Sequence, residues 1–151
     1  MCKKRTVYLA YGSNLNISQM ARRCPDAKPW GATVLQDYKL TFWGGYGNAV
    51  ATIIPCEGSF VPVALWIITE TDERALDIYE GFPRMYRKEY LDLRWRGRYV
   101  KAMVYIMNHG STNVPSKGYF NTIYEGYQDF SINPDPLFQA FRKSWKNQST
   151  P

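Results

Sequence analysis

The feature that most constrains the fold is a series of short apolar segments rich in β-branched and aromatic residues. Each segment is bounded by Gly, Pro or Asn, and this pattern is typical of β-strands. The stretch Tyr90–Trp95 nearly alternates between apolar and polar residues, as a half-buried antiparallel strand does. We expect strands at Thr6–Tyr11, Ala32–Trp43, Ala49–Ile54, Phe60–Thr69, Tyr86–Trp95 and Tyr99–Met107.

Helical patterns lie at the two ends of the chain and in one insertion between strands. A Cys24-Pro25 pair ends the first helix, because the residue before a proline disfavours helical angles. Gly81 is placed as the stop of the second helix. We expect helices at Ser18–Arg23, Thr71–Glu80 and Tyr119–Phe130, with the last region continuing at Pro136–Trp145 after a break at Asn133-Pro134. This order predicts an α+β fold, with a small mixed, barrel-like sheet flanked by helices.

The length of 151 residues fits one domain. We expect a single domain over residues 1–151, with a core at about 6–130 and a helical C-terminal tail at about 131–151. The longest apolar stretch, Phe60–Ile68, is too short to span a bilayer. The N-terminal residues lack the apolar run of a signal peptide. We therefore expect a cytoplasmic protein without a membrane partner.

Few residues are available for metal binding or nucleophilic catalysis. The three cysteines form no CxxC pair and the chain has one histidine, so zinc-ligand spacing is absent and we expect no metal and no cofactor. The histidine, His109, follows a predicted strand beside Gly110 and is expected to be an exposed turn residue. Acid–base chemistry in this chain would then use carboxylates, tyrosines or lysines.

The net charge of +6 raises the question of an anionic partner. A nucleic acid could stack on Trp95 and Tyr99 of the basic segment Tyr86–Lys101 only if both rings face the same side as the arginines. The simpler interpretation is that the basic residues, Arg84 and Arg87 among them, point to solvent. An anionic small molecule also fits, and we expect no nucleic-acid partner.

The first predicted strand ends on the segment Tyr11-Gly12-Ser13-Asn14, which leads directly into a helix. Asn16 and Gln19 form an approximate capping box for that helix. Gly12 can adopt backbone angles closed to other residues, and its lack of a side chain lets a ligand approach the main chain. The N–H groups of this turn suit a carboxylate or a developing oxyanion. A plain turn without a ligand explains the same residues.

Three carboxylates, at Glu73, Asp77 and Glu80, fall on one face of the second helix. Such a stripe is typical of a solvated helix face. Glu80 differs because it is the last residue before Gly81, where the helix dipole disfavours a negative charge and raises the carboxyl pKa. A raised pKa is what a general acid–base group needs near neutral pH.

In combination, several short segments resemble the γ-glutamylcyclotransferase-like family. The resemblance covers about Tyr8 to Tyr127. The matching segments are Tyr11-Gly12-Ser13-Asn14, Ala51-Thr52-Ile53, Ala64-Leu65-Trp66, Tyr79-Glu80-Gly81, Met85-Tyr86, Tyr105-Ile106-Met107 and Pro115-Ser116-Lys117-Gly118-Tyr119. The resemblance implies a small barrel of mixed strands with a cavity at one side. A γ-glutamyl compound would enter this cavity and cyclise to 5-oxoproline, releasing an amine or amino acid.

The resemblance also implies roles for individual residues. Glu80 would be the catalytic acid–base group. The turn residues Tyr11, Gly12, Ser13 and Asn14 would bind the glutamyl moiety. Tyr105 and Tyr119 would line the cavity, although an ordinary place in the aromatic core explains them equally well. Tyr86 needs no special role.

The implied partner is a small γ-glutamyl substrate, bound by a monomer or homodimer. The alternative is a non-catalytic protein that binds a small acidic ligand on the same fold.

Overall fold

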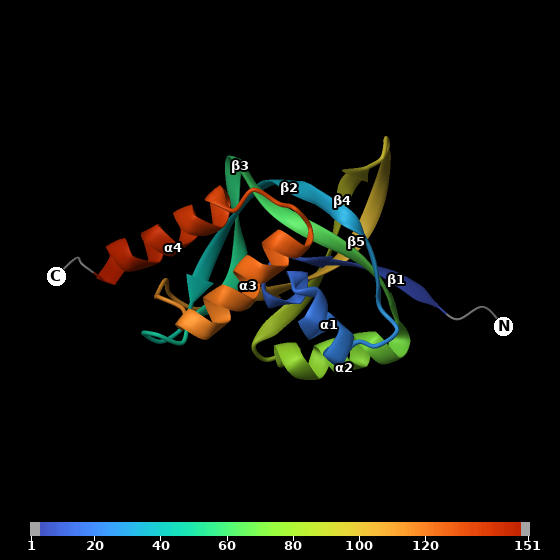
Figure 1. The fold of residues 1–151 in the computed structure, drawn as a ribbon, viewed down its shortest axis with the longest axis horizontal. Helices are drawn as coiled ribbons and strands as arrows, with labels where there is room; N and C mark the ends of the chain where they lie inside the picture. Colours follow the sequence, from blue (N-terminus) through green and yellow to red (C-terminus); the bar gives the residue numbers. More distant parts are fainter. Residues whose placement is uncertain (1–3, 149–151) are drawn as a thin grey trace.

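The computed structural model describes residues 4–148. Figure 1 shows the helices and strands that follow. In chain order they are β1 (Arg5–Ala10), η1 (Ser13–Leu15), α1 (Ile17–Arg23), β2 (Lys28–Trp43), β3 (Val50–Thr69), α2 (Glu70–Glu80), β4 (Tyr86–Trp95), β5 (Arg98–Met107), α3 (Lys117–Asp129) and α4 (Asp135–Gln148). The expected α+β composition is confirmed.

The five strands form one mixed sheet in the order β2-β3-β1-β5-β4. The central strand β1 is antiparallel to β3 and parallel to β5. Its C-terminal half is buried without interruption from Tyr8 to Ala10. The turn that follows therefore leaves the sheet from its middle, surrounded by other elements.

The sheet is curved but not closed into a barrel. Within residues 4–148 the edge strands β2 and β4 share no backbone ladder. They meet through side chains, with the rings of Trp30 and Trp95 5.5 Å apart between centroids. The Trp95 ring also lies against Gly31, where a Cβ would overlap it. The bulk of these indoles stands between the two edges, so the barrel-like expectation holds for the curvature and not for closure.

The segment Val50–Thr69 is one strand, where the sequence predicts two. The expected break at residues 55–59 is instead a bulge. Gln36 pairs with Phe60 and Tyr38 pairs with Pro55, so the residues between Pro55 and Phe60 stand opposite the single Asp37. Asp37 has a φ of 66° and its carboxylate accepts the Gly58 N–H at 3.0 Å. This bulge absorbs the irregular residues without ending the strand.

Helix boundaries follow the expected capping residues. The Asn16 side chain accepts the Gln19 N–H at 3.0 Å and starts α1. The Gln19 side chain accepts from Arg23 and so does not complete the predicted capping box. Helix α2 begins with a full capping box between Thr69 and Asp72 and ends at Gly81, whose φ is 65°.

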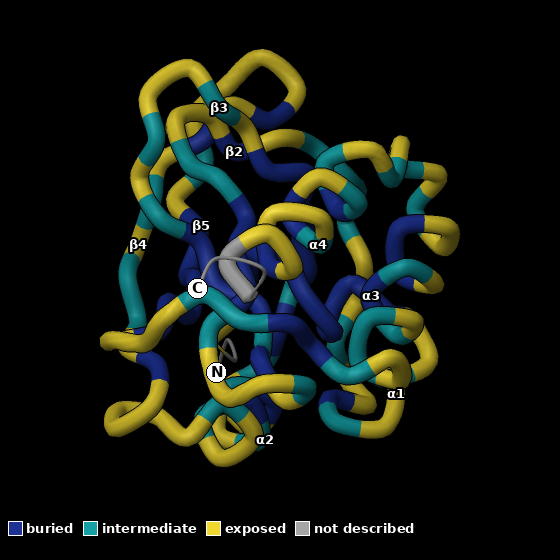
Figure 2. Tube along the Cα trace, turned by 90° about the vertical axis from the view of Figure 1, so that its left-hand side faces the viewer, coloured by how far each residue is buried: buried dark blue, intermediate teal, exposed yellow. Residues whose placement is uncertain are grey.

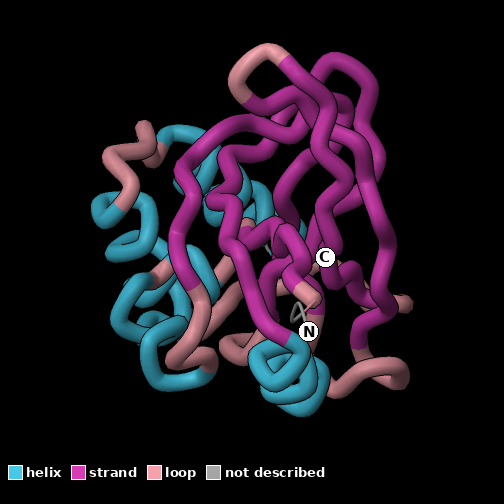
Figure 3. The backbone as a smooth tube through the Cα atoms, turned by 90° about the vertical axis from the view of Figure 1, so that its right-hand side faces the viewer, coloured by secondary structure: helices cyan, strands magenta, loops and turns pink. Residues whose placement is uncertain are grey.

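Helices and strands occupy different parts of the molecule. In Figure 3 the helices gather along one side and one end of the strands. Figure 2 shows buried stretches through the interior and exposed hairpin tips and outer helix faces. Helix α3 packs on η1 at Gly126, and α4 adds Leu137 and Ala140 to the core. No helix in residues 4–148 combines the length and apolarity of a membrane span.

Candidate active site

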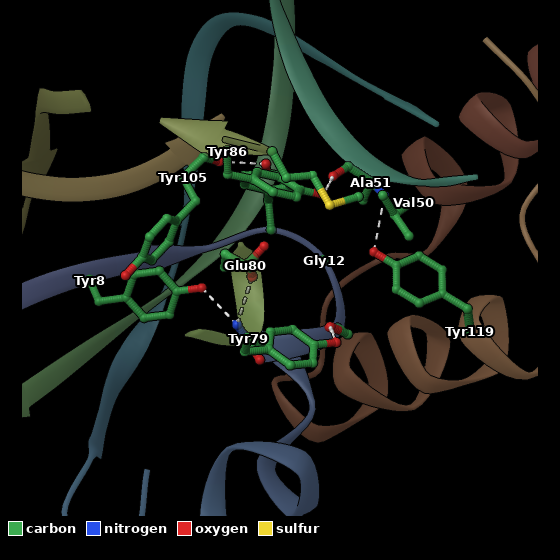
Figure 4. A pocket seen from close by; sticks show the side chains of 13 residues that line it. Tyr8, Gly12, Val50, Ala51, Tyr79, Glu80, Tyr86, Tyr105 and Tyr119 are labelled. Atoms are coloured by element: carbon green, nitrogen blue, oxygen red, sulfur yellow. Dashed lines mark hydrogen bonds between the residues drawn. The ribbon is translucent and has the colours of Figure 1, made fainter. Parts of the chain in front are cut away.

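A cavity of about 200 Å³ lies at the end of β1. It is smaller than the pockets that hold drug-sized ligands. Figure 4 shows Glu80 within it and aromatic rings around it. Every site residue expected from the sequence lines it. The complete lining is Tyr8, Tyr11, Gly12, Ser13, Asn14, Val50, Ala51, Tyr79, Glu80, Met85, Tyr86, Tyr105 and Tyr119.

The turn after β1 leaves two backbone N–H donors unused beside this cavity. The Leu15 N–H donates to the Gly12 carbonyl and the Asn16 N–H to the Ser13 carbonyl, each at 3.0 Å. The N–H groups of Ser13 and Asn14, at the first two positions of η1, have no acceptor within the turn. Both residues are buried and line the cavity. Such N–H groups suit a carboxylate or an oxyanion.

Gly12 is required for space, and not for a left-handed backbone. Its φ of −121° is not left-handed, but its ψ of −131° lies outside the α and β regions, which agrees with the expectation of unusual backbone angles at this glycine. A Cβ at this position would lie 3.2 Å from the Ala51 Cβ and 3.5 Å from the Tyr119 hydroxyl oxygen. The absence of a side chain therefore keeps this wall of the cavity open.

Glu80 is the only residue with an ordinarily charged side chain in the described lining. It is the last residue of α2 and is half-buried. The Asn14 amide nitrogen lies 3.4 Å from its Oε1 atom. Burial raises the pKa of the Glu80 carboxyl to about 7, against the opposing effect of the nearby Arg23 charge. The carboxyl can therefore exchange a proton near neutral pH.

The other two carboxylates of the expected stripe do not form a free solvated face. Glu73 and Asp77 both pair with the Lys88 ammonium, at 2.5 and 2.9 Å. Asp77 also accepts the Tyr105 O–H at 2.6 Å. Burial alone would lower the Lys88 pKa, but the two acidic partners hold it above its usual value. This cluster ties α2 to β4 and fixes one cavity tyrosine.

Four tyrosines of the cavity, Tyr11, Tyr86, Tyr105 and Tyr119, stay neutral at physiological pH. Tyr11 donates to the Tyr105 carbonyl at 2.6 Å, and Tyr86 donates to the Ala51 carbonyl at 2.8 Å. Tyr119 accepts the Ala51 N–H at 3.0 Å, so its own proton can face a ligand. Burial is the main reason that the pKa values of these hydroxyls and of Tyr105 lie well above the usual value.

Several residues that line the cavity or contact its wall were not expected from the sequence. Tyr8 and Tyr79 line the cavity, where they contact Asn14 and Ser13, and Arg23 contacts Asn14 from outside it. Tyr79 directly precedes Glu80, and this adjacency is the one local signal that could have found it. Tyr86, expected to have no special role, also lines the cavity.

Several basic and aromatic residues lie away from the cavity. Arg84 and His109 are exposed, as expected. Arg87 is exposed but pairs with Glu89 at 2.6 Å and donates to the Met107 carbonyl at 3.0 Å.

The two rings considered for base stacking do not share a face. Trp95 is buried, whereas Tyr99 is exposed beside Arg94. Among residues 4–148, no group of three or more His, Cys, Asp or Glu side chains could hold a metal ion.

Comparisons with known proteins agree on one family. A family model described as γ-glutamyl cyclotransferase, AIG2-like, matches residues 8–124. Curated relatives from Bos taurus and Homo sapiens, both named γ-glutamylcyclotransferase, are each 27% identical over 140 residues, or 88% of this chain. The chain spans 65% of the length of these relatives.

A solved structure of a γ-glutamyl cyclotransferase has the same fold, with a TM-score of 0.82 at 24% identity. The match covers 91% of this chain and 86% of that one.

Proposed function

The chain belongs to the γ-glutamyl cyclotransferase, AIG2-like family, and from this premise we propose that it cyclises the γ-glutamyl group of a small γ-glutamyl amine or amino acid. The products are 5-oxoproline and the free amine or amino acid. The observation that carries the proposal is the state and position of the Glu80 carboxyl. Its carboxyl has a pKa of about 7 and shares one small cavity with buried N–H and O–H donors.

The reaction begins with a proton transfer. The Glu80 carboxylate accepts a proton from the substrate's α-ammonium group, and the freed amine attacks the γ-carbonyl carbon of the same molecule. A C–N bond forms and the carbonyl oxygen becomes an oxyanion. Collapse of this intermediate breaks the original amide C–N bond. The protonated Glu80 donates its proton to the departing nitrogen. The restored carboxylate then takes the second proton from the ring nitrogen and passes it to the free amine, which leaves as an ammonium.

The cavity supplies binding groups that suit these steps. The free N–H groups of Ser13 and Asn14 and the Tyr119 hydroxyl can hold the glutamyl carboxylate or the oxyanion. Because nucleophile and electrophile belong to one molecule, the protein needs only to hold the substrate folded. Correct orientation contributes up to about 7–11 kcal/mol in well-placed intramolecular reactions. No protein nucleophile is required.

The direct test is release of 5-oxoproline from a panel of γ-glutamyl amino acids and γ-glutamylamines, measured by chromatography. We expect turnover of at least one panel member, at a rate proportional to protein concentration. Absence of turnover across the panel, combined with saturable binding of a panel member by calorimetry, would instead support the non-catalytic binding protein. Absence of both would contradict the assignment of the cavity.

The pH dependence of catalysis follows from the Glu80 pKa. Only the ionised carboxylate accepts a proton, so kcat/KM is expected to fall about tenfold per pH unit below the pKa of about 7 and to level off above it. Steady-state rates with the best panel substrate measure this profile. A profile that is flat from about pH 5 to 8 would contradict a role for Glu80 as the base.

Replacement of Gly12 by alanine is expected to weaken substrate binding while the fold is retained. The added methyl group would lie close to Ala51 and point towards the Tyr119 hydroxyl, which narrows the cavity. We expect kcat/KM to fall about tenfold or more, since small misplacements of substrate are costly. Gly45→Ala is the matched control, because its Cβ meets nothing within 4 Å. Equal kinetics for the two variants would contradict the proposed approach of substrate to Gly12.

A further inference from the structure

Arg23 contacts the cavity wall without lining the cavity. It is the last residue of α1 and is half-buried. Its guanidinium carbon lies 3.6 Å from the centre of the Tyr79 ring. One terminal nitrogen donates to Gln19 Oε1 at 2.7 Å, and the other donates to Asn14 Oδ1. The side chain is therefore held by three partners, two of which line the cavity.

The chemistry of this contact decides which way the Asn14 amide points. A guanidinium can only donate hydrogen bonds, so the amide oxygen of Asn14 must face Arg23. The amide nitrogen then faces the cavity, where it lies 2.9 Å from the Tyr8 hydroxyl and 3.4 Å from Glu80 Oε1. In the reversed orientation two acceptors, the amide oxygen and the carboxylate, would face one another.

We propose that Arg23 is a positioning residue that fixes the orientation of the Asn14 amide and so keeps an N–H donor directed at Glu80. This inference rests on the proposed function for its kinetic consequence. The proposed effect of Arg23 on the Asn14 amide and the Glu80 carboxyl does not depend on turnover. Arg23 acts through Asn14, which touches Glu80, and not by contact with substrate.

The Asn14 N–H donor is important because few other groups around Glu80 stabilise its ionised form. Among residues 4–148, Arg23 is the cation whose charge lowers the Glu80 pKa, and Asp77 lies one turn earlier on α2. The remaining groups are buried or half-buried hydroxyls, which stay neutral, and the partly exposed Tyr79. They come from β1, the turn after it, β4, β5 and α3, and are Tyr8, Tyr11, Tyr86, Tyr105 and Tyr119. Loss of Arg23 removes both a charge and the constraint on the amide.

The test replaces Arg23 by methionine, which keeps much of the length but neither donates nor carries charge. The Glu80 carboxyl is titrated by carbon-13 NMR in the full-length protein. We expect its midpoint to rise by about 1 pH unit in Arg23→Met and to return part of the way in Arg23→Lys, which still donates. Arg22→Met is the matched control, since Arg22 is an exposed neighbour on the same helix. Its midpoint should equal that of the wild type.

The route through Asn14 is tested by repeating Arg23→Met in an Asn14→Ala background. A shift clearly smaller than in the wild-type background supports positioning through the amide. Equal shifts in both backgrounds, or no shift in Arg23→Met, would overturn the proposal. The kinetic pH profile should move with the NMR midpoint. If the wild type turns over no substrate, the proposed function fails while the titration still decides the role of Arg23.

Discussion

Glu80→Gln is expected to lower kcat/KM for 5-oxoproline formation by about 10²–10⁴-fold, the usual contribution of one general acid–base group. The amide keeps the size of the side chain and a possible hydrogen bond with Asn14, so binding of substrate should be retained. Product formation and substrate affinity are measured separately, by chromatography and calorimetry. Glu70→Gln, an exposed change at the other end of α2, is the control. Unchanged turnover in Glu80→Gln would remove this residue from the mechanism.

The same substitution should stabilise the protein at alkaline pH. The folded protein holds the Glu80 proton with a pKa of about 7, against an ordinary value of 4.5. Between these values the folded state binds more protons than the unfolded state, so the free energy of unfolding falls as pH rises through this window. Above pH 7, the ionised Glu80 carboxylate lowers the free energy of unfolding by on the order of 3 kcal/mol. A glutamine at this position does not ionise, so the variant does not lose this stability. Urea unfolding at about pH 8 should therefore show Glu80→Gln more stable than wild type, with the difference vanishing towards pH 4.

Gly126→Ala is expected to destabilise the fold by about 1–3 kcal/mol and to abolish most activity. A Cβ at Gly126 would lie 2.7 Å from the Leu15 carbonyl carbon and 2.8 Å from the Asn16 nitrogen. Both atoms belong to backbone, which cannot move aside cheaply. Helix α3 would then push on the turn that carries Ser13 and Asn14. Thermal unfolding and 5-oxoproline assays measure the two effects.

Gly118→Ala provides a matched control on the same helix. Nothing lies within 4 Å of a Cβ at Gly118. Alanine is the better helix former, so this variant should gain roughly 0.5–1 kcal/mol and keep its activity. A Gly126→Ala variant that behaves like Gly118→Ala would show that α3 does not set the position of the turn.

Residues that start and end helices explain most of the helix boundaries predicted from the sequence. Gly81 ends α2 because it adopts a left-handed φ, and Asn16 starts α1 by accepting a backbone N–H. Both signals act within a few residues, so they can be recognised in the sequence without a structure. The cavity set from Tyr11 to Asn14, with Glu80, was reached through its resemblance to a family pattern together with these signals.

Long-range contacts explain what was missed. Whether the sheet closes depends on the meeting of Trp30 and Trp95, which come from opposite edges. Lys88 reaches Glu73 and Asp77 only because β4 passes beside α2. Arg23 and Tyr79 meet across two helices. No spacing rule within one element encodes such pairs.

The central position of β1 has a consequence for how a ligand enters and leaves. The turn after β1 follows a strand that is paired with β3 on one side and β5 on the other, so the start of the turn is fixed by the interior of the sheet. The exposed side chains of the cavity lining are less constrained than this turn. Tyr79 is 44% exposed and Met85 is 48% exposed. The Tyr79 side chain is held by a hydrogen bond with Ser13 and by the Arg23 guanidinium, whereas exposed side chains such as Met85 can change rotamer within nanoseconds. Met85 is therefore the part of the cavity lining that can most readily move aside when a ligand enters or leaves.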